Sequence, residues 1–245
     1  MRMDEHAKIE AVVLAGGRGT RLQPYTAEVP KPLVSIGGRT IIEILLHTLR
    51  RHNITRVRLA VNHLANLITT ALGDGRDCGM EVTYSHEDRP LSTVGPLTLM
   101  RDLPEHFLVL NGDILTDMNY RRLYDYHMDN GALVTVATCQ REHRIDYGVM
   151  EIGATGRVTG FSEKPSHRFT VSAGVYVFSR EVLRYVPEGE PFGFDQLMLR
   201  LLEGGEPIAT YPFDGYWLDI GRVEDYLQAN EDIERINRLL LTDPR

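Results

Sequence analysis

A glycine-rich segment near the N-terminus contains the residue types that bind a polyphosphate. The apolar run Ala11–Ala15 ends in Gly16-Gly17-Arg18-Gly19-Thr20-Arg21, and Pro30-Lys31-Pro32-Leu33 follows nine residues later. Glycines permit a turn in which consecutive backbone N–H groups are exposed where a Cβ atom would clash. The side chains of Arg21 and Lys31 would add positive charge beside these donors. The segment therefore predicts a nucleotide-binding loop rather than a simple structural turn.

Two common phosphate-binding motifs do not match this segment. A P-loop requires Gly-x-x-x-x-Gly-Lys-Ser/Thr, and the chain contains no Lys-Ser or Lys-Thr pair. A dinucleotide fingerprint starting at Gly17-x-Gly19 would need a third glycine at position 22, where the chain has Leu22. A nicotinamide-dependent oxidoreductase is excluded on the same ground.

The segment LAGGRGTRLQPYTAEVPKPLVSIGGRTIIE, residues 14–43, resembles the sugar-phosphate nucleotidylyltransferases, and later motifs extend the resemblance to about Glu231. The ending WLDIGRVEDYLQAN looks closest to the short mannose- or heptose-1-phosphate guanylyltransferases of that family. The resemblance implies that this loop surrounds the triphosphate of a nucleoside triphosphate, and that Arg21 and Lys31 neutralise the phosphate charge. The residues that it assigns to this loop are Leu14, Ala15, Gly16, Gly17, Gly19 and Thr20.

Two aspartates have the surroundings expected of metal ligands. Asp113 follows the apolar run Phe107–Leu110, and Asp219 follows Trp217-Leu218 and precedes Ile220-Gly221. An aspartate beyond the carboxyl end of a parallel strand lies where such sheets bind ligands, although a lone one is also common in an Asx turn. In the resembled family both positions hold divalent metal. We therefore expect Asp113 and Asp219 to bind Mg²⁺, which prefers oxygen ligands.

The resemblance also assigns residues to the two substrates. On the sugar-phosphate side it implies hydrogen bonds from Glu163, charge pairing by Lys164 and a backbone contact at Gly148. Ser172 and Gly174 match an Asn-Ala-Gly-x-Tyr segment in which serine replaces the asparagine. On the nucleotide side, Glu87 is a candidate acceptor for a guanine base or an ordinary surface charge, and Ser92 replaces a glycine that would contact the base.

Positioning these residues requires a sheet with helices on both of its faces. Strand-like runs alternate with helical patterns up to about residue 140, and this rhythm predicts an α/β, Rossmann-like, mainly parallel sheet. Helices are expected at 41–51, 64–72, 120–128, 194–202 and 223–240, with Thr40 as a cap. Shorter strands at 147–152, 158–161 and 171–178 predict a smaller mixed or antiparallel part. We expect one catalytic domain, with a nucleotide-binding half (about 8–140) and a sugar-phosphate-binding half (about 141–231).

Composition excludes several functional classes. A formal charge of −7 over 245 residues argues against nonspecific nucleic-acid binding. No stretch is apolar over 18 residues, so no membrane span is expected, and the charged N-terminus MRMDEHAKIE lacks a secretion signal. Cys78 and Cys139 have no metal-ligand spacing and suggest free thiols in a cytoplasmic protein. The C-terminal hexapeptide repeats of larger relatives are not expected. An apolar stripe on the last helix is expected to cover the core, although a homo-oligomer contact remains open.

These features predict nucleotidyl transfer from an NTP to a sugar 1-phosphate, with release of pyrophosphate. The resemblance favours GTP and a mannose- or heptose-type phosphate. Two alternatives remain: dTTP, UTP or CTP with a glucose-type phosphate, and a noncatalytic nucleotide-sugar-binding subunit. No histidine is expected to act in catalysis, so most of the nine should be surface or packing residues.

Overall fold

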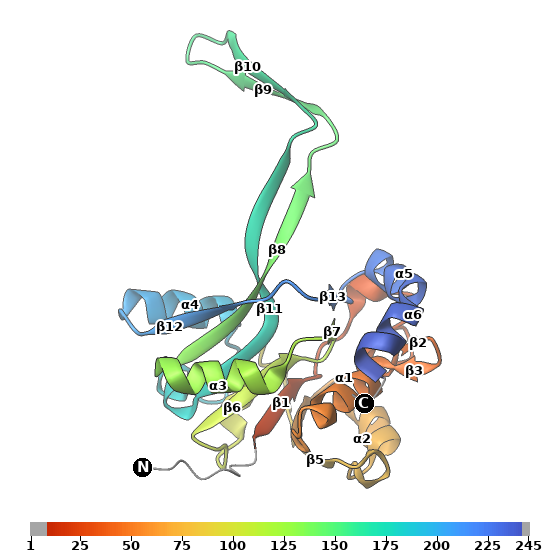
Figure 1. Ribbon diagram of the computed structural model, residues 1–245. Helices are drawn as coiled ribbons and strands as arrows, with labels where there is room; N and C mark the ends of the chain where they lie inside the picture. Colours follow the sequence, from red (N-terminus) through yellow and green to blue (C-terminus); the bar gives the residue numbers. More distant parts are fainter. Residues whose placement is uncertain (1–8, 242–245) are drawn as a thin grey trace.

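The computed structural model describes residues 9–241, so the expectation of no N-terminal signal falls mainly on residues outside that range. The centre of the fold is a seven-stranded sheet with the order β12-β8-β11-β6-β1-β4-β5 (Figure 1). Its strands are β1 (Glu10–Leu14), β4 (Arg56–Val61), β5 (Glu81–His86), β6 (His106–Asn111), β8 (Val134–Arg144), β11 (Ser166–Ser179) and β12 (Ile208–Pro212). Smaller two-stranded sheets pair β2 (Ser35–Ile36) with β3 (Arg39–Thr40), β7 (Ile114–Thr116) with β13 (Trp217–Asp219), and β9 (Gly148–Ile152) with β10 (Val158–Glu163).

The strand directions confirm a mixed, mainly parallel sheet. Strands β5, β4, β1 and β6 pair in parallel, whereas β11 runs antiparallel to both β6 and β8. The edge strand β12 is parallel to β8. The carboxyl ends of β1, β4 and β6 therefore meet at one edge of the sheet, which is where open α/β sheets bind ligands.

Helices cover both faces of the sheet, as the sequence predicts. On one face, Ala11 and Val13 of β1 share a core cluster with helices α1 and α3, whereas Val12 points into a second cluster with α4. The helices are α1 (Ile41–Arg51), α2 (Ala65–Leu72), α3 (Tyr120–Asn130), α4 (Phe194–Glu203), α5 (Val223–Glu231) and α6 (Ile233–Ile236). The short 3-10 turns are η1 (Thr20–Leu22), η2 (Lys31–Leu33), η3 (Arg76–Cys78), η4 (Gly95–Leu99) and η5 (Arg180–Tyr185), and η6 (Asn237–Leu241) is a π-helical turn. Across the described residues, no helix is long and apolar enough to cross a bilayer.

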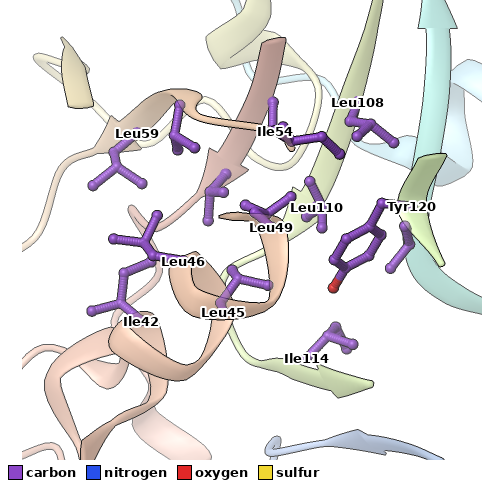
Figure 2. Packing of buried hydrophobic residues seen from close by; sticks show 14 of the residues in the cluster. Ile42, Leu45, Leu46, Leu49, Ile54, Leu59, Leu108, Leu110, Ile114 and Tyr120 are labelled. Carbon is purple, nitrogen blue, oxygen red and sulfur yellow. The ribbon is translucent and has the colours of Figure 1, made fainter. Parts of the chain in front are cut away.

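Helix α1 forms where the sequence predicts it because its cap and its apolar spacing agree. Thr40 and Glu43 form a reciprocal capping box, in which Glu43 N–H donates to Thr40 Oγ1 at 3.3 Å and Thr40 N–H donates to Glu43 Oε2 at 2.7 Å. Figure 2 shows Leu45 and Leu49 on the buried face of α1, beside Leu110 of β6 and the ring of Tyr120. This packing fixes α1 against the strands that end at the candidate site.

The C-terminal helix differs from the expected single helix over 223–240. It is broken after Glu231 into α5, α6 and η6. At this break, the hydroxyl of Tyr216, just before β13, donates to Asp232 Oδ2 at 3.3 Å. The apolar stripe nevertheless packs on the molecule's own core, as predicted, since Ile236 and Leu240 are fully buried against residues of α1.

The second half of the chain contains a long projection that the sequence did not predict. The strand expected at 171–178 is much longer, because β11 starts at Ser166, and β8 likewise continues outward to Arg144. Their outer portions pair with each other from Ser172↔Thr138 to Ser166↔Arg144, and the β9–β10 hairpin extends them further (Figure 1). We call residues 140–171 the arm. The strand residues of its inner part, 140–144 and 166–171, are mostly polar and none of them is buried, which is why apolar patterning alone does not extend β8 and β11 into the arm.

His127 on α3 is a buried packing residue and gives a testable pH dependence. Its Nδ1 lies 2.8 Å from Thr135 Oγ1 and its Nε2 lies 3.0 Å from His106 Nδ1. Burial, and next the neighbouring His106, lower the pKa of His127 to about 4. At pH values between about 4 and 6.5, His127 binds a proton in the unfolded chain but not in the folded one. The free energy of unfolding should therefore decrease as the pH falls from about 6.5 toward about 4.

Thermal unfolding between about pH 7.5 and pH 5 measures this effect, expected as a few degrees of melting temperature. In His127→Gln, the loss of melting temperature on acidification should be smaller than in the unsubstituted protein. The exposed His143, replaced in the same way, is the control and should leave the slope unchanged. An unaltered slope in His127→Gln would contradict the assignment.

Candidate active site

The glycine-rich loop follows β1 directly and is held in shape by local hydrogen bonds. Gly19 has a φ of 61°, in the left-handed region that favours glycine. Its carbonyl accepts from Thr26 Oγ1 at 2.7 Å and from Leu22 N–H at 2.9 Å. A Cβ atom at Gly16 would lie 2.7 Å from Glu87 Oε1, whereas one at Gly17 would meet no atom within 4 Å. The loop is therefore tightly packed behind Gly16 and open in front of Gly17.

Asp113 and Asp219 are brought together by the pairing of β7 with β13. That pairing aligns Asp219 with Ile114, the residue that follows Asp113. The N–H of Ile220 also donates to the carbonyl of Asp113 at 3.0 Å. Two carboxylates separated by more than a hundred positions in the sequence therefore lie side by side, as the resemblance implies.

The charges around this pair are arranged for a cation. Lys31 forms a salt bridge with Asp113 Oδ2. The other oxygen of this carboxylate, Oδ1, is buried and has no hydrogen-bond partner among the described residues. Burial, and next the charge of Asp113, raise the pKa of Asp219 to about 6. A divalent cation would supply a partner for Asp113 Oδ1 and would reduce the repulsion between the two carboxylates. The pair therefore fits Mg²⁺.

A cavity of about 360 Å³ opens at the carboxyl ends of β1, β4 and β6. Its lining is Leu14, Gly16, Gly17, Arg21, Ala60, Glu87, Pro90, Ser92, Thr93, Pro96, Asn111, Asp113 and Asp219. A neighbouring cavity of about 200 Å³ is lined by Gly17, Gly19, Thr20, Arg21, Lys31, Asp113 and Gly221. A small third cavity reaches Ala15 beside Lys31. We call this group of cavities the cleft. A larger hollow of about 570 Å³ between α1 and α2 contains none of the predicted site residues.

Arg21 completes the polar side of the cleft. A Cβ atom at Gly221 would lie 3.6 Å from both Arg21 Nη2 and Asp219 Oδ1. The Arg21 guanidinium and the Asp219 carboxylate therefore both lie beside Gly221. The glycine loop, the Arg21 guanidinium and two carboxylates suit a phosphate chain bound together with a divalent cation.

Glu87 and Ser92 line the same cavity, and Glu87 packs directly behind Gly16 of the glycine loop. The carboxylate of Glu87 accepts from Leu91 N–H at 2.9 Å, and burial raises its pKa. Its backbone carbonyl accepts from Asn62 Nδ2 at 2.8 Å. Ser92 has a φ of 65°, a left-handed conformation that favours glycine, and the resembled family has glycine at this position.

The predicted sugar-phosphate residues are split between two places. Ser172 and Gly174 lie at the base of β11. There Ser172 Oγ donates to Tyr176 Oη at 3.0 Å, and a Cβ atom at Gly174 would lie 2.7 Å from Asn111 Nδ2. Gly148, Glu163 and Lys164 lie instead on the arm, at the base of the β9–β10 hairpin, where Glu163 pairs with Gly148 and Lys164 follows β10 (Figure 1). They are exposed, and none of them lines the cleft.

Some lining residues were not identified from the sequence. Asn111 and Thr93 both line the cavity, and Thr93 Oγ1 accepts from Phe194 N–H at 2.8 Å. Asn111 stands immediately before Gly112-Asp113 at the end of a parallel strand, and that position was a usable signal. Thr93 carried no comparable signal, because its position at the cleft depends on the contact between its loop and the start of α4, which is distant in the sequence.

Comparison with known proteins agrees with this geometry. A family model described as nucleotidyl transferase matches residues 10–236. A UTP–glucose-1-phosphate uridylyltransferase of Synechocystis sp. is 32% identical over 90% of this chain and 62% of that protein. A mannose-1-phosphate guanylyltransferase catalytic subunit beta of Drosophila pseudoobscura pseudoobscura is 33% identical over 89% of this chain and 60% of that protein. The chain thus spans about three-fifths of the length of these relatives.

Among solved structures, HddC from Yersinia pseudotuberculosis, complexed with GMP-PN, superimposes with a TM-score of 0.73. The match covers 92% of this chain and 99% of HddC at 24% sequence identity, which establishes a shared fold. The family match spans nearly the whole described chain, including both strand ends that carry the paired aspartates. The chain belongs to the nucleotidyl transferase family.

Proposed function

We propose that this protein transfers a nucleotidyl group from a nucleoside triphosphate to a sugar 1-phosphate and releases pyrophosphate. The observation that carries the proposal is the convergence of Asp113 and Asp219 beside a glycine-lined cavity that also contains Arg21. The relatives, described as sugar-1-phosphate uridylyl- and guanylyltransferases, support the same reaction.

The reaction is one in-line displacement that needs no side-chain nucleophile. An oxygen of the sugar 1-phosphate forms a bond to the α-phosphorus while the bond from that phosphorus to the β-phosphate bridging oxygen breaks. A phosphate with a second pKa of about 6 is already mostly dianionic at neutral pH. The barrier therefore lies in bringing two anions together, and catalysis consists of positioning and charge neutralisation.

The residues of the cleft divide this work. Backbone N–H groups of the glycine loop bind the triphosphate, and Arg21 and Lys31 balance its charge. Asp113 and Asp219 would hold Mg²⁺, which supplies further neutralisation of the reacting phosphates when bound. Within the described residues no group of three or more Cys, His, Asp or Glu side chains is placed to hold a metal. Mg²⁺ commonly takes one or two carboxylates together with substrate oxygens, which matches this pair.

We further infer GTP and a mannose- or heptose-type phosphate as the substrates. Glu87 lines the cavity, so its carboxylate can accept from the N–H groups of a guanine edge. Seven of the relatives are described as mannose-1-phosphate guanyl- or guanylyltransferases. The rival is uridylyl transfer to glucose 1-phosphate, the reaction named for the Synechocystis relative.

A pyrophosphate-release assay tests both levels of the proposal. Five nucleoside triphosphates are each combined with mannose, heptose and glucose 1-phosphates. We expect metal-dependent release that is fastest with GTP. Fastest release with UTP and glucose 1-phosphate would reassign the substrates. No release with any pair would favour a noncatalytic nucleotide-sugar-binding subunit.

The raised pKa of Asp219 predicts a pH-dependent cation site. A proton and a divalent cation compete for the Asp219 carboxylate, and its pKa is raised to about 6. Without cation, the folded protein binds a proton between about pH 4 and pH 6 that the unfolded chain does not, so stability falls as the pH rises through that range. The increase in melting temperature caused by Mg²⁺ should be larger at about pH 7.5 than at about pH 5.

Asp219→Asn should abolish most of this Mg²⁺-induced shift and its pH dependence. The exposed Asp214, replaced by asparagine, is the matched control and should behave like the unsubstituted protein. A Mg²⁺ shift of equal size at both pH values would argue against cation binding at this carboxylate.

A further inference from the structure

Thr26 is a buried polar residue in the segment that joins the glycine-rich loop to Lys31. This segment, residues 23–30, contains none of the site residues expected from the sequence. Thr26 is only 3% exposed, and its hydroxyl donates to the carbonyl of Gly19 at 2.7 Å. A buried hydroxyl seven residues further along the chain is therefore committed to one peptide group of the glycine-rich loop.

The hydrogen bond to Thr26 fixes a peptide group that glycine alone would leave free to turn. Gly19 has a φ of 61° and a ψ of 26°, and glycine adopts positive and negative φ values about equally readily. The N–H of Leu22 also donates to the Gly19 carbonyl at 2.9 Å, so two donors hold this oxygen. In a trans peptide the carbonyl oxygen and the following N–H point in opposite directions. The two donors therefore turn the N–H of Thr20 away from Thr26.

Thr20 belongs to the wall of the cleft, whereas Thr26 does not. Thr20 lines the cavity of about 200 Å³, and Thr26 lines none of the three cavities that form the cleft. Thr20 is also the first residue of η1, and the first N–H groups of a helix have no partner within it. An N–H that points away from the buried Thr26, on a residue that lines the cavity, is placed to donate to an anion there.

Packing holds Thr26 in place from two sides. A Cβ atom at Gly19 would lie 3.0 Å from Thr26 Cγ2 and 3.2 Å from Lys31 Cβ, so both side chains pack close to the backbone of Gly19. The neighbouring Tyr25 ties the same segment to α5, since the centroids of the Tyr25 and Tyr226 rings lie 4.3 Å apart. The hydroxyl of Thr26 is therefore presented to the Gly19 carbonyl by a segment that is itself anchored.

We propose that Thr26 is a positioning residue for the phosphate chain of the nucleotide. Its hydroxyl holds the peptide between Gly19 and Thr20 in the orientation that directs the N–H of Thr20 into the cleft. Thr26 contacts no substrate and acts through this peptide. The identity of the ligand rests on the proposed function, but the orientation of the peptide does not.

Calorimetric titration with inorganic pyrophosphate and Mg²⁺ measures the phosphate site without reference to the nucleobase. Thr26→Val keeps a branched side chain but removes the hydroxyl, so the Kd for pyrophosphate should rise about tenfold. Thr26→Ser keeps the hydroxyl, and its Kd should stay within about twofold of that of the unsubstituted protein. An unchanged Kd in Thr26→Val, or an equally large loss of affinity in Thr26→Ser, would overturn the proposal.

Thr48→Val on α1 is the matched control. Thr48 is 2% exposed, its hydroxyl donates to the carbonyl of Ile44 at 2.9 Å, and it lines none of the cavities of the cleft. This substitution removes an equivalent buried hydrogen bond, so it should lower the melting temperature by an amount similar to Thr26→Val. The affinity for pyrophosphate should not change. An equal loss of affinity in both valine variants would show general destabilisation and would reject the positioning role.

Hydrogen exchange at the Leu22 amide, measured by NMR without ligands, tests the orientation of the peptide by itself. Because Leu22 N–H donates to the Gly19 carbonyl, loss of the second donor should speed its exchange several-fold in Thr26→Val but not in Thr48→Val. Unchanged exchange in Thr26→Val would show that Thr26 does not hold this peptide. If the unsubstituted protein binds no pyrophosphate, the proposed function is contradicted instead, and the exchange measurement then decides the role of Thr26.

Discussion

Asp113→Asn and Asp219→Asn should each lower turnover by at least about 10²–10³-fold while the protein stays folded. Each substitution removes one of the two negative charges that would hold Mg²⁺ against the triphosphate. Neither should unfold the chain, because replacing Asp219 relieves its repulsion with Asp113 and replacing Asp113 leaves the backbone bond to Ile220 in place. Pyrophosphate release and melting temperature, measured on the same samples, separate the two effects.

The matched control is again Asp214→Asn, five residues before Asp219, where the side chain is exposed and does not line the cleft. It should retain the unsubstituted rate. Rates close to normal in both variants of the acidic pair would remove Asp113 and Asp219 from the chemistry. A large fall in melting temperature would show instead that the pair is structural.

Gly17→Val should leave stability nearly unchanged but reduce the apparent affinity for the triphosphate by about tenfold to a hundredfold. No atom lies within 4 Å of a Cβ at this position, and the residue lines both main cavities of the cleft. The new side chain would therefore occupy the space in which phosphates approach the loop N–H groups, where small displacements are costly for catalysis. Nucleotide titration by calorimetry, together with a thermal melt, measures the two quantities.

Gly204→Ala at the end of α4 is the control for this prediction. Its nearest neighbours to a Cβ are at 3.4 Å or beyond, so the substitution fits there as well, but far from the cleft. Nucleotide affinity should not change. Equal affinities for Gly17→Val and the unsubstituted protein would place the triphosphate elsewhere.

The parts of the fold that were predictable from sequence are those determined by neighbouring residues. Helix α1 runs from Ile41 to Arg51 as expected, because its capping box and apolar spacing are both local signals. The glycine loop and Asp113 were identifiable because each follows a short apolar strand. Parallel strands then bring such loops to one edge, so the composition of this part of the cleft followed from the strand order.

The remaining features depend on contacts between distant segments. The short strand β13 forms because it pairs with β7, and three residues carry too little pattern to reveal that pairing. At the break after Glu231, Asp232 accepts a hydrogen bond from Tyr216, which lies in a different segment of the chain. The inner part of the arm, 140–144 and 166–171, consists of mostly polar strands that pair with each other, so apolar periodicity indicated only the outer strands β9 and β10. The resemblance assigned Lys164 to the sugar-phosphate site, whereas the fold places it on the arm, at the base of the β9–β10 hairpin and outside the lining of the cleft.

The salt bridge between Lys31 and Asp113 has a kinetic consequence. The ammonium group lies beside the acidic pair where a cation would bind. Mg²⁺ held by Asp113 and Asp219 would compete with this ammonium for Asp113 Oδ2, and a bound triphosphate would offer Lys31 a new acceptor. We therefore expect ordered addition, in which the metal-bound nucleotide enters first and the sugar phosphate second.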